Sequence, residues 1–162
     1  MSSELRFDVL VLGGGGAALR AALSACEQGA KTAILSKGEA GKSGATYYSV
    51  AEVGAFNVPD GALDPEDSPE EFYRDMEMAA LGTAQLPLCR ILAEQAESAL
   101  QYLEKISGGT VFAKEDGHFK VYQACFSTRP RSHVVENHFK PIGRRWPEGT
   151  SRFSAVCRRW IC

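Results

Sequence analysis

Four consecutive glycines, residues 13–16, constrain the fold of this chain more than any other feature. They directly follow residues 8–12, an almost wholly apolar run that is typical of a strand buried on both faces of a parallel sheet. They precede residues 17–28, which are rich in helix-forming residues. Gly29 follows this segment and is suited to the left-handed position after a helix. Residues 31–36 form a second candidate strand. This order predicts a Rossmann-like βαβ unit with a right-handed crossover, and hence an α/β fold.

The glycine turn matches a known phosphate-binding pattern. Gly13, Gly15 and Ala18 satisfy G-x-G-x-x-G/A, in which the first residue allows a tight turn, the second lets a diphosphate approach the backbone, and the third permits close packing of helix on strand. The free N–H groups at the start of the helix, at Gly16 and Ala17, favour a negative charge there. We therefore predict a dinucleotide site at these five residues. The alternative is a flexible glycine turn that binds nothing.

The residues after the second strand argue against a nicotinamide cofactor. An acidic residue about 20 positions after the glycines is expected to bind the ribose of NAD. At that place the chain has Ser36 and Lys37. A short nicotinamide-binding protein is therefore the less favoured interpretation.

Three segments carry a resemblance to a known family: residues 9–23, residues 34–38 and residues 43–48. Together they resemble the N-terminal FAD-binding region of the succinate dehydrogenase/fumarate reductase flavoproteins, and within that family the pattern is closest to the L-aspartate oxidases. The helical segments that follow are similar as well, so the resemblance covers about residues 7–127. It implies that Ser36 and Lys37 contact the adenosine ribose. It also implies that the loop Ser43, Gly44, Ala45 and Thr46 lies along the diphosphate and flavin.

The resemblance further implies a function. It predicts a flavin-dependent oxidoreductase that transfers hydride between flavin N5 and a dicarboxylate such as succinate, fumarate or L-aspartate, with an iron–sulfur subunit as a possible partner. Covalent members carry a histidine in the loop after the serine. Residues 43–46 contain none, so FAD is expected to bind non-covalently. The alternative is a non-catalytic remnant or dinucleotide-binding module.

Two departures from the family's pattern limit how far the family's function can be inferred for this chain. Ala51 and Glu52 stand where the family usually has a glycine pair near the flavin ring. The residues after Ser127 are also too few for a substrate-capping domain, and the resemblance stops near Gly143. We therefore expect an incomplete domain, with residues 1–127 as the N-terminal part of an FAD-binding domain. Residues 128–162 are expected to be a basic tail, poorly ordered or out of frame, which would make the chain a fragment lacking full activity by itself.

Between these regions the sequence predicts two helices and a β-hairpin. Ser68, Pro69 and Glu71 form a helix start with a capping box, and Phe72 and Met76 begin its apolar face. A second helix starts near residue 87 and stops before residue 108. Its apolar positions at helical spacing are Leu88, Ile91, Leu92, Ala96, Ala99, Leu100 and Leu103. Residues 110–113 and 119–122 flank an Asp-Gly turn and are expected to pair as a hairpin.

Charge, hydropathy and cysteine content argue against several other classes of protein. The net charge of −2 gives no general attraction to nucleic acid, although it combines −8 over residues 1–127 with +6 over residues 128–162. No apolar run reaches the roughly 20 residues that cross a membrane. Five scattered cysteines suggest neither a disulfide scaffold nor a zinc module, so the expected location is the cytoplasm. No metal site is expected, because His133 and His138 are expected to be free surface histidines. The acids Glu70, Glu71, Asp75 and Glu77 are expected to form a solvated helical turn.

Overall fold

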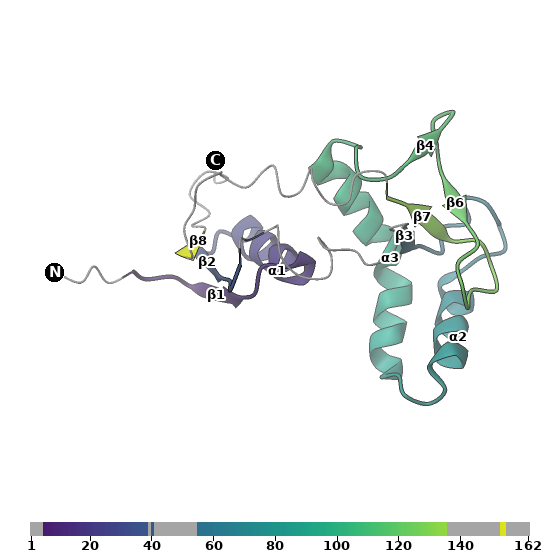
Figure 1. Cartoon of the computed structure of the whole chain (residues 1–162), viewed down its shortest axis with the longest axis horizontal. Coiled ribbons are helices and arrows are strands. Elements are labelled where there is room, and N and C mark those ends of the chain that lie inside the picture. The colour runs from purple at the N-terminus through teal and green to yellow at the C-terminus, as the bar shows by residue number, and fades with distance from the viewer. Residues whose placement is uncertain (1–4, 39, 41–54, 136–152, 155–162) are drawn as a thin grey trace. The chain divides into compact units, whose positions relative to one another are not determined.

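A computed structural model of the chain describes residues 5–38, 40, 55–135 and 153–154 (Figure 1). The chain divides into two compact units. The first contains strand β1 (Val9–Leu12), helix α1 (Gly16–Glu27), strand β2 (Thr32–Leu35) and strand β8 (Phe153–Ser154). The second contains the other described elements, which lie between residues 55 and 135. The mixed α/β fold predicted from the sequence is confirmed.

The first unit has the predicted order of strand, glycine turn, helix and strand. β1 pairs in parallel with β2, in a register that runs from Val9 opposite Thr32 to Leu12 opposite Leu35. β8 adds an antiparallel pair on the other edge of β2, so the strand order is β1-β2-β8. Gly29 follows α1 with a φ of +83°, a left-handed conformation that glycine adopts without steric cost. The βαβ unit is therefore observed at the residues that predicted it.

The two faces of this sheet differ in burial. α1 packs on one face, where Leu19, Ala22 and Ile34 are buried and Val11 packs against them. On the other face, Leu10 and Leu12 keep 59% and 72% of their surface exposed. The prediction that this strand is buried on both faces is therefore wrong for the described part of the chain. The apolar run indicates that both faces of the strand are suited to burial. Successive side chains of a strand point to opposite faces, and α1 covers only one of these faces.

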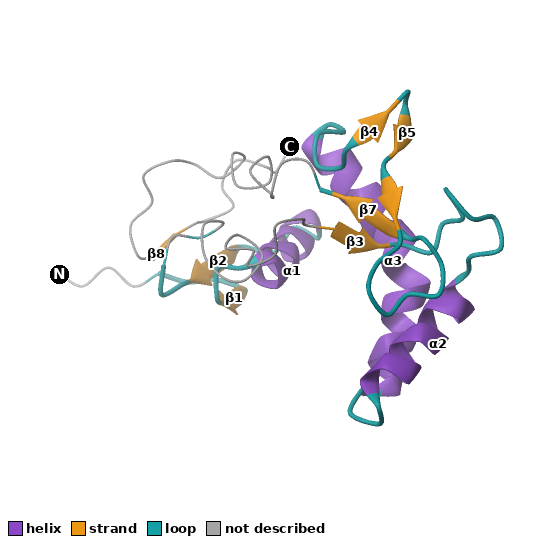
Figure 2. Cartoon of the chain, turned by 45° about the vertical axis from the view of Figure 1, so that its right-hand side comes forward, coloured by secondary structure: helices purple, strands orange, loops and turns teal. Residues whose placement is uncertain are grey.

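The second unit is built on an antiparallel pair of helices, α2 (Pro69–Ala80) and α3 (Leu86–Ser107), shown side by side in Figures 1 and 2. Ser68 caps α2 as predicted, since its Oγ accepts a hydrogen bond from the N–H of Glu71 at 3.3 Å. The reciprocal half of the capping box is different. The N–H of Ser68 donates to Asp67 at 3.0 Å, while the Glu71 carboxylate pairs with Arg74. α3 ends, as predicted, where Gly108 takes a left-handed φ of +69°.

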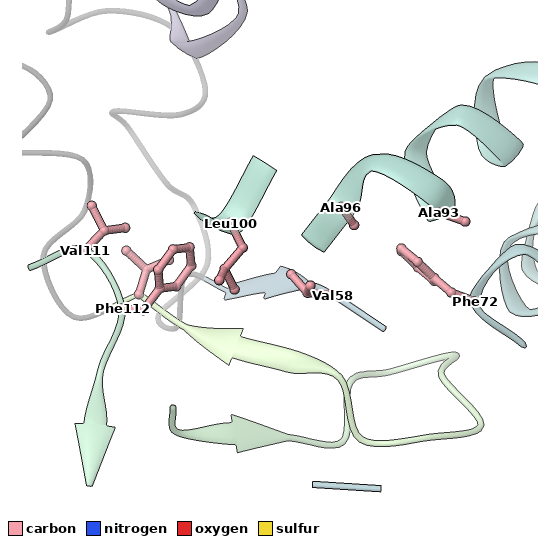
Figure 3. Packing of buried hydrophobic residues seen from close by; sticks show 8 residues of the cluster. Val58, Phe72, Ala93, Ala96, Leu100, Val111 and Phe112 are labelled. Atoms are coloured by element: carbon pink, nitrogen blue, oxygen red, sulfur yellow. The ribbon is translucent and has the colours of Figure 1, made fainter. Parts of the chain in front are cut away.

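The core face of α3 is only partly the predicted one. Ala93, Ala96 and Leu100 are buried, and Figure 3 shows the two alanines near the Phe72 ring of α2. The apolar positions of the first turns, Leu88, Ile91 and Leu92, are exposed instead. The apolar arc of α3 is therefore wider than the surface that α2 and the adjoining sheet cover in this unit.

A small antiparallel sheet packs against these helices. Its order is β3-β7-β6, with β7 (Ser132–Val134) between β3 (Ala55–Asn57) and β6 (Val121–Tyr122). Val58, Val111 and Phe112 are buried between the sheet and α3, as Figure 3 shows. Residues 128–162 are expected to be a basic tail, poorly ordered or out of frame, yet within the described part of the chain residues 132–134 form the central strand of this sheet.

The predicted hairpin exists, but its strands are shorter than expected. β4 (Lys114–Glu115) pairs with β5 (His118–Phe119) around Asp116 and Gly117, whose φ values are +51° and +83°. Two positive φ values in succession are typical of a tight type I′ turn. The pairing extends to Ala113, whose carbonyl accepts the N–H of Lys120 at 2.9 Å, while residues 121–122 pair with β7 instead.

One arginine links three segments of the second unit from a buried position. The guanidinium of Arg131 donates to Asp67 at 2.7 and 3.0 Å and to Asp75 at 2.5 Å, and its side chain has no exposed surface. Thr128 donates to the same oxygen of Asp75 through its N–H and its hydroxyl. Asp75 is therefore a buried partner of Arg131, and the prediction that it belongs to a solvated helical turn is wrong.

This pairing shifts the titration of the buried groups. Burial raises the pKa of Asp75, but hydrogen bonds from Thr128 and Arg131 outweigh burial and bring the pKa below its ordinary value. Burial lowers the pKa of Arg131, but Asp67 and Asp75 outweigh it and raise the pKa. Both shifts favour the charged forms, because each charge lies next to an opposite one.

His133 is buried too, contrary to the expectation of a free surface histidine. Its side chain has no exposed surface, and its Nε2 lies 2.9 Å from Asp60 Oδ2. Burial raises the pKa of Asp60, but hydrogen bonds from His133 and from the N–H of Ala62 lower it to a net value below the ordinary one. His138 lies outside the described residues.

The lowered pKa values of Asp60 and Asp75 predict the acid response of this unit. Their contribution to stability is present above the pKa of an unfolded aspartate, about 3.9, and is lost as the pH falls through the lower folded value. We expect the free energy of unfolding, measured with urea, to decrease as the pH falls below about 4. Asp75→Asn should cost about 3 to 5 kcal/mol at neutral pH, because it breaks a buried ion pair.

Asp64→Asn is the matched control, because Asp64 pairs with Arg129 at 2.6 Å in a more exposed position. It should change the unfolding free energy much less than Asp75→Asn does. Equal effects of the two substitutions would contradict the assignment of Arg131 and Asp75 as the central pair.

The exposed leucines of β1 predict association of the chain in solution. A surface that exposes neighbouring large apolar side chains favours contact between molecules. Replacing Leu10 and Leu12 by threonine keeps the strand propensity and should lower light scattering at micromolar concentration. Ile34→Thr, on the buried face, should instead destabilise the unit. An unchanged, monodisperse monomer before and after the double substitution would contradict the prediction.

Candidate functional site

The turn after β1 adopts a conformation that requires glycine. Gly13 has a φ of +119°, and its N–H donates to the carbonyl of Leu35 at 2.8 Å. A Cβ at Gly13 would lie 3.7 Å from the Cβ of Ala18, an ordinary contact. The backbone angle, rather than lack of space, therefore makes this position specific for glycine.

The start of α1 offers backbone donors without a competing side chain. Gly15 is the residue before the helix, with φ −86° and ψ −175°, and it has no side chain that could cap the helix. The N–H groups of Gly16, Ala17 and Ala18 have no intrahelical acceptor, since they belong to the first turn of a helix. No acidic residue stands in this first turn. The positive end of the helix dipole is therefore left for an external anion.

The start of α2 shows what a filled helix N-terminus looks like in the same chain. There, Ser68 caps the helix with its hydroxyl, proline occupies the first position, and Glu70 and Glu71 bring negative charge to the first turn. α2 therefore satisfies its own donors and dipole, whereas α1 does not.

Ser36 and Lys37 lie at the same edge of the sheet as the glycine turn. β1 and β2 are parallel and in register up to Leu12 and Leu35, so the residues after both strands meet at one edge. Ser36 is half-buried and Lys37 is exposed there. A hydroxyl and a cation thus follow the strand that pairs with β1, at the edge where the glycine turn lies, a combination suited to the sugar and phosphates of a nucleotide.

The remaining predicted site residues lie outside the described part of the chain. These are Ser43, Gly44, Ala45 and Thr46, together with Ala51 and Glu52. Their expected roles along the diphosphate and flavin stay predictions.

The polar cluster of the second unit was missed by sequence reasoning. Its signal was present as three basic residues at alternate positions, Arg129, Arg131 and His133. Arg131 and His133 are fully buried and paired with aspartates, so they offer no surface to a ligand. Within the described residues, no group of three or more His, Cys, Asp or Glu side chains could hold a metal ion. In the same residues, no helix is long and apolar enough to span a membrane.

Comparison with known proteins bears on the family to which the chain belongs. The family model described as "FAD binding domain" matches residues 8–153. Among curated proteins, the chain is 40% identical over 118 residues to a subunit of the fumarate reductase (CoM/CoB) of Methanothermobacter marburgensis. The match covers 72% of this chain and 20% of that protein, so the chain spans about a fifth of its relative.

Solved structures show the same fold. Sdh1 of Mycobacterium smegmatis in complex with UQ1 matches 84% of this chain and 22% of its own, with a TM-score of 0.72 and 26% identity. The open conformation of a flavocytochrome c3 fumarate reductase matches 86% of this chain and 25% of its own, with a TM-score of 0.69 and 21% identity. The family model covers most of the chain, and these relatives are of the type that the glycine turn and its neighbouring segments predicted. The chain therefore belongs to the family of FAD-binding domains, among flavoproteins of the succinate dehydrogenase/fumarate reductase type.

Proposed function

We propose that this chain is the FAD-binding portion of a flavin-dependent oxidoreductase that acts on dicarboxylates such as succinate, fumarate or L-aspartate. The observation that carries the proposal is the start of α1. There, a left-handed glycine turn presents uncapped N–H groups at the end of a parallel strand. That geometry supports a Rossmann-like mode of binding, in which the helix N-terminus neutralises a diphosphate.

Each described residue of the site has a role in this proposal. Gly13 makes the turn, and Gly15 leaves the backbone open to the diphosphate. The N–H groups of Gly16, Ala17 and Ala18 donate to its oxygens. On the neighbouring strand, Ser36 and Lys37 bind the adenosine ribose in place of the usual acidic residue. The loop Ser43, Gly44, Ala45 and Thr46 completes the site along the diphosphate and flavin.

The division of work between cofactor and protein follows from the site. Bound FAD supplies the hydride chemistry, and the protein binds and orients it. Because residues 43–46 contain no histidine, the proposal includes non-covalent attachment. The dicarboxylate substrate, an iron–sulfur partner and a cytoplasmic location remain predictions drawn from the family resemblance.

The first test is whether the purified chain takes up FAD. We expect added FAD to bind and to show a shifted flavin absorption spectrum, and acid to release the cofactor intact from the protein. Binding without oxidation of succinate or L-aspartate, or reduction of fumarate, would support a cofactor-binding portion lacking full activity alone. No binding in calorimetry would contradict the proposed site.

Gly15→Asp separates cofactor binding from folding. An aspartate before the helix caps it and complements its dipole, so the free energy of unfolding should rise by about 0.5 to 1 kcal/mol. The same carboxylate would occupy the free donors and repel the diphosphate. We expect the Kd for FAD to rise at least about tenfold, which corresponds to 1.4 kcal/mol. The two quantities are measured by urea unfolding and by titration calorimetry.

Ser68→Ala is the matched control at the other helix start. It removes the cap of α2 and should lower stability by about 1 kcal/mol while leaving FAD affinity unchanged. If Gly15→Asp binds FAD as tightly as the unchanged chain, the diphosphate does not lie at the start of α1.

A further inference from the structure

Both ring nitrogens of the buried His133 face hydrogen-bond acceptors. Nε2 lies 2.9 Å from a carboxylate oxygen of Asp60, and Nδ1 lies 3.2 Å from the backbone carbonyl of Arg131. That carbonyl also accepts the N–H of Val58 at 2.8 Å, and it cannot donate. A neutral imidazole carries one N–H and one lone pair, so either tautomer would leave a lone pair directed at an oxygen. Protonation of both nitrogens removes this conflict.

The proton could alternatively reside on Asp60, but its surroundings favour a carboxylate. The second oxygen of Asp60, Oδ1, accepts the N–H of Ala62 at 3.1 Å. The side chain of Asp60 is also 15% exposed, so it is partly solvated. Hydrogen bonds from donors and partial solvation both stabilise the ionised form.

The charges around His133 point the same way. The neighbouring buried cluster holds two carboxylates, Asp67 and Asp75, and one guanidinium, Arg131. Asp60 pairs instead with His133, so a positive charge on the ring would balance the charge of this carboxylate. The elements packed against the ring supply uncharged groups, the rings of Phe112 and Phe119. Lys114 lies over Phe119 at 5.0 Å from that ring, and its ammonium pairs with Glu104.

We propose that His133 is a buried imidazolium ion that forms a proton-dependent latch with Asp60. The latch ties the segment 58–62 to β7, because His133 lies in β7 and Asp60 lies after β3. Its two hydrogen bonds need both ring protons. Loss of one proton as the pH rises removes a hydrogen bond and leaves an uncompensated carboxylate beside the core.

The direction of the pH effect follows from linkage. The latch needs one more proton on the folded ring than a neutral histidine carries, so this contact links folding to proton binding. The contribution of the latch to stability is therefore greatest at low pH and decreases as the pH rises. With rising pH the equilibrium constant for unfolding should increase by up to about tenfold per pH unit, the limit for one linked proton.

Nitrogen-15 NMR of the histidine rings in the full chain tests the proton count directly. His118, which is exposed on β5, serves as an internal reference. At a pH where His118 has become neutral, we expect both nitrogens of His133 to keep the chemical shifts and attached protons of an imidazolium. A single neutral tautomer of His133 at that pH would overturn the proposal. This measurement needs no variant, so it remains decisive if substitutions prevent folding.

Urea unfolding from about pH 6 to pH 9 tests whether the latch contributes to the stability of the fold. We expect His133→Gln, which can still donate to Asp60 but does not titrate, to abolish the rise of the unfolding constant with pH. His118→Gln is the control and should leave that rise unchanged. Asp60→Asn removes the carboxylate that faces Nε2 and should weaken the imidazolium signal of His133 in the NMR experiment. A pH dependence that survives His133→Gln would overturn the proposal.

Discussion

The candidate site depends on the hydrogen bond from the N–H of Gly13 to the carbonyl of Leu35. This bond continues the parallel pairing of β1 and β2 one residue past the strands, so the chain must leave the sheet at Gly13 with a positive φ. The turn then delivers Gly15 to the position before α1 and leaves the first N–H groups of the helix uncapped. Replacing this geometry with an ordinary capped helix would stabilise α1 locally and remove its capacity to bind an anion. The start of α1 is therefore locally less stable than a capped helix start would be, which is consistent with the proposed role of its free donors.

In the second unit, short strands are held in place by a small apolar core together with a buried polar cluster. Arg131 reaches Asp67 before α2 and Asp75 within it, and Thr128 adds two donors to Asp75. A buried ion pair adds little net stability compared with apolar residues of the same shape, but removing one partner is costly. The cluster thus works mainly as a constraint on pairing. Strand β7 can occupy the centre of the sheet only in the register that brings Arg131 to both aspartates, because any shift would bury unpaired charges.

The sequence predicted the features that are decided within a few residues. The glycine turn, the serine cap at Ser68, the Asp-Gly hairpin turn and the left-handed end of α3 each follow from local backbone preferences. It did not predict the partners of Arg131 and His133, because these join positions more than 50 residues apart and no local pattern records such pairing. For the same reason the strand at residues 132–134 was assigned to a tail. The glycine turn at residues 13–18 was predictable because such a turn is itself a local structure, whereas the binding roles of these residues and of Ser36 and Lys37 stay predictions.

The largest errors concerned burial rather than secondary structure, and they share a cause. Apolar residues at the correct period fixed the type of element for β1 and for α3, yet Leu12 and Leu88 remain exposed. A hydrophobic pattern indicates that a surface is suited to burial, and it does not identify what covers it. β1 carries apolar side chains on both faces, and the apolar arc of α3 extends beyond the residues that contact α2 and the sheet. Both elements therefore have the composition of central elements that pack on two sides, while the described chain covers only one side of each. This is the pattern expected of elements whose second apolar surface forms an interface.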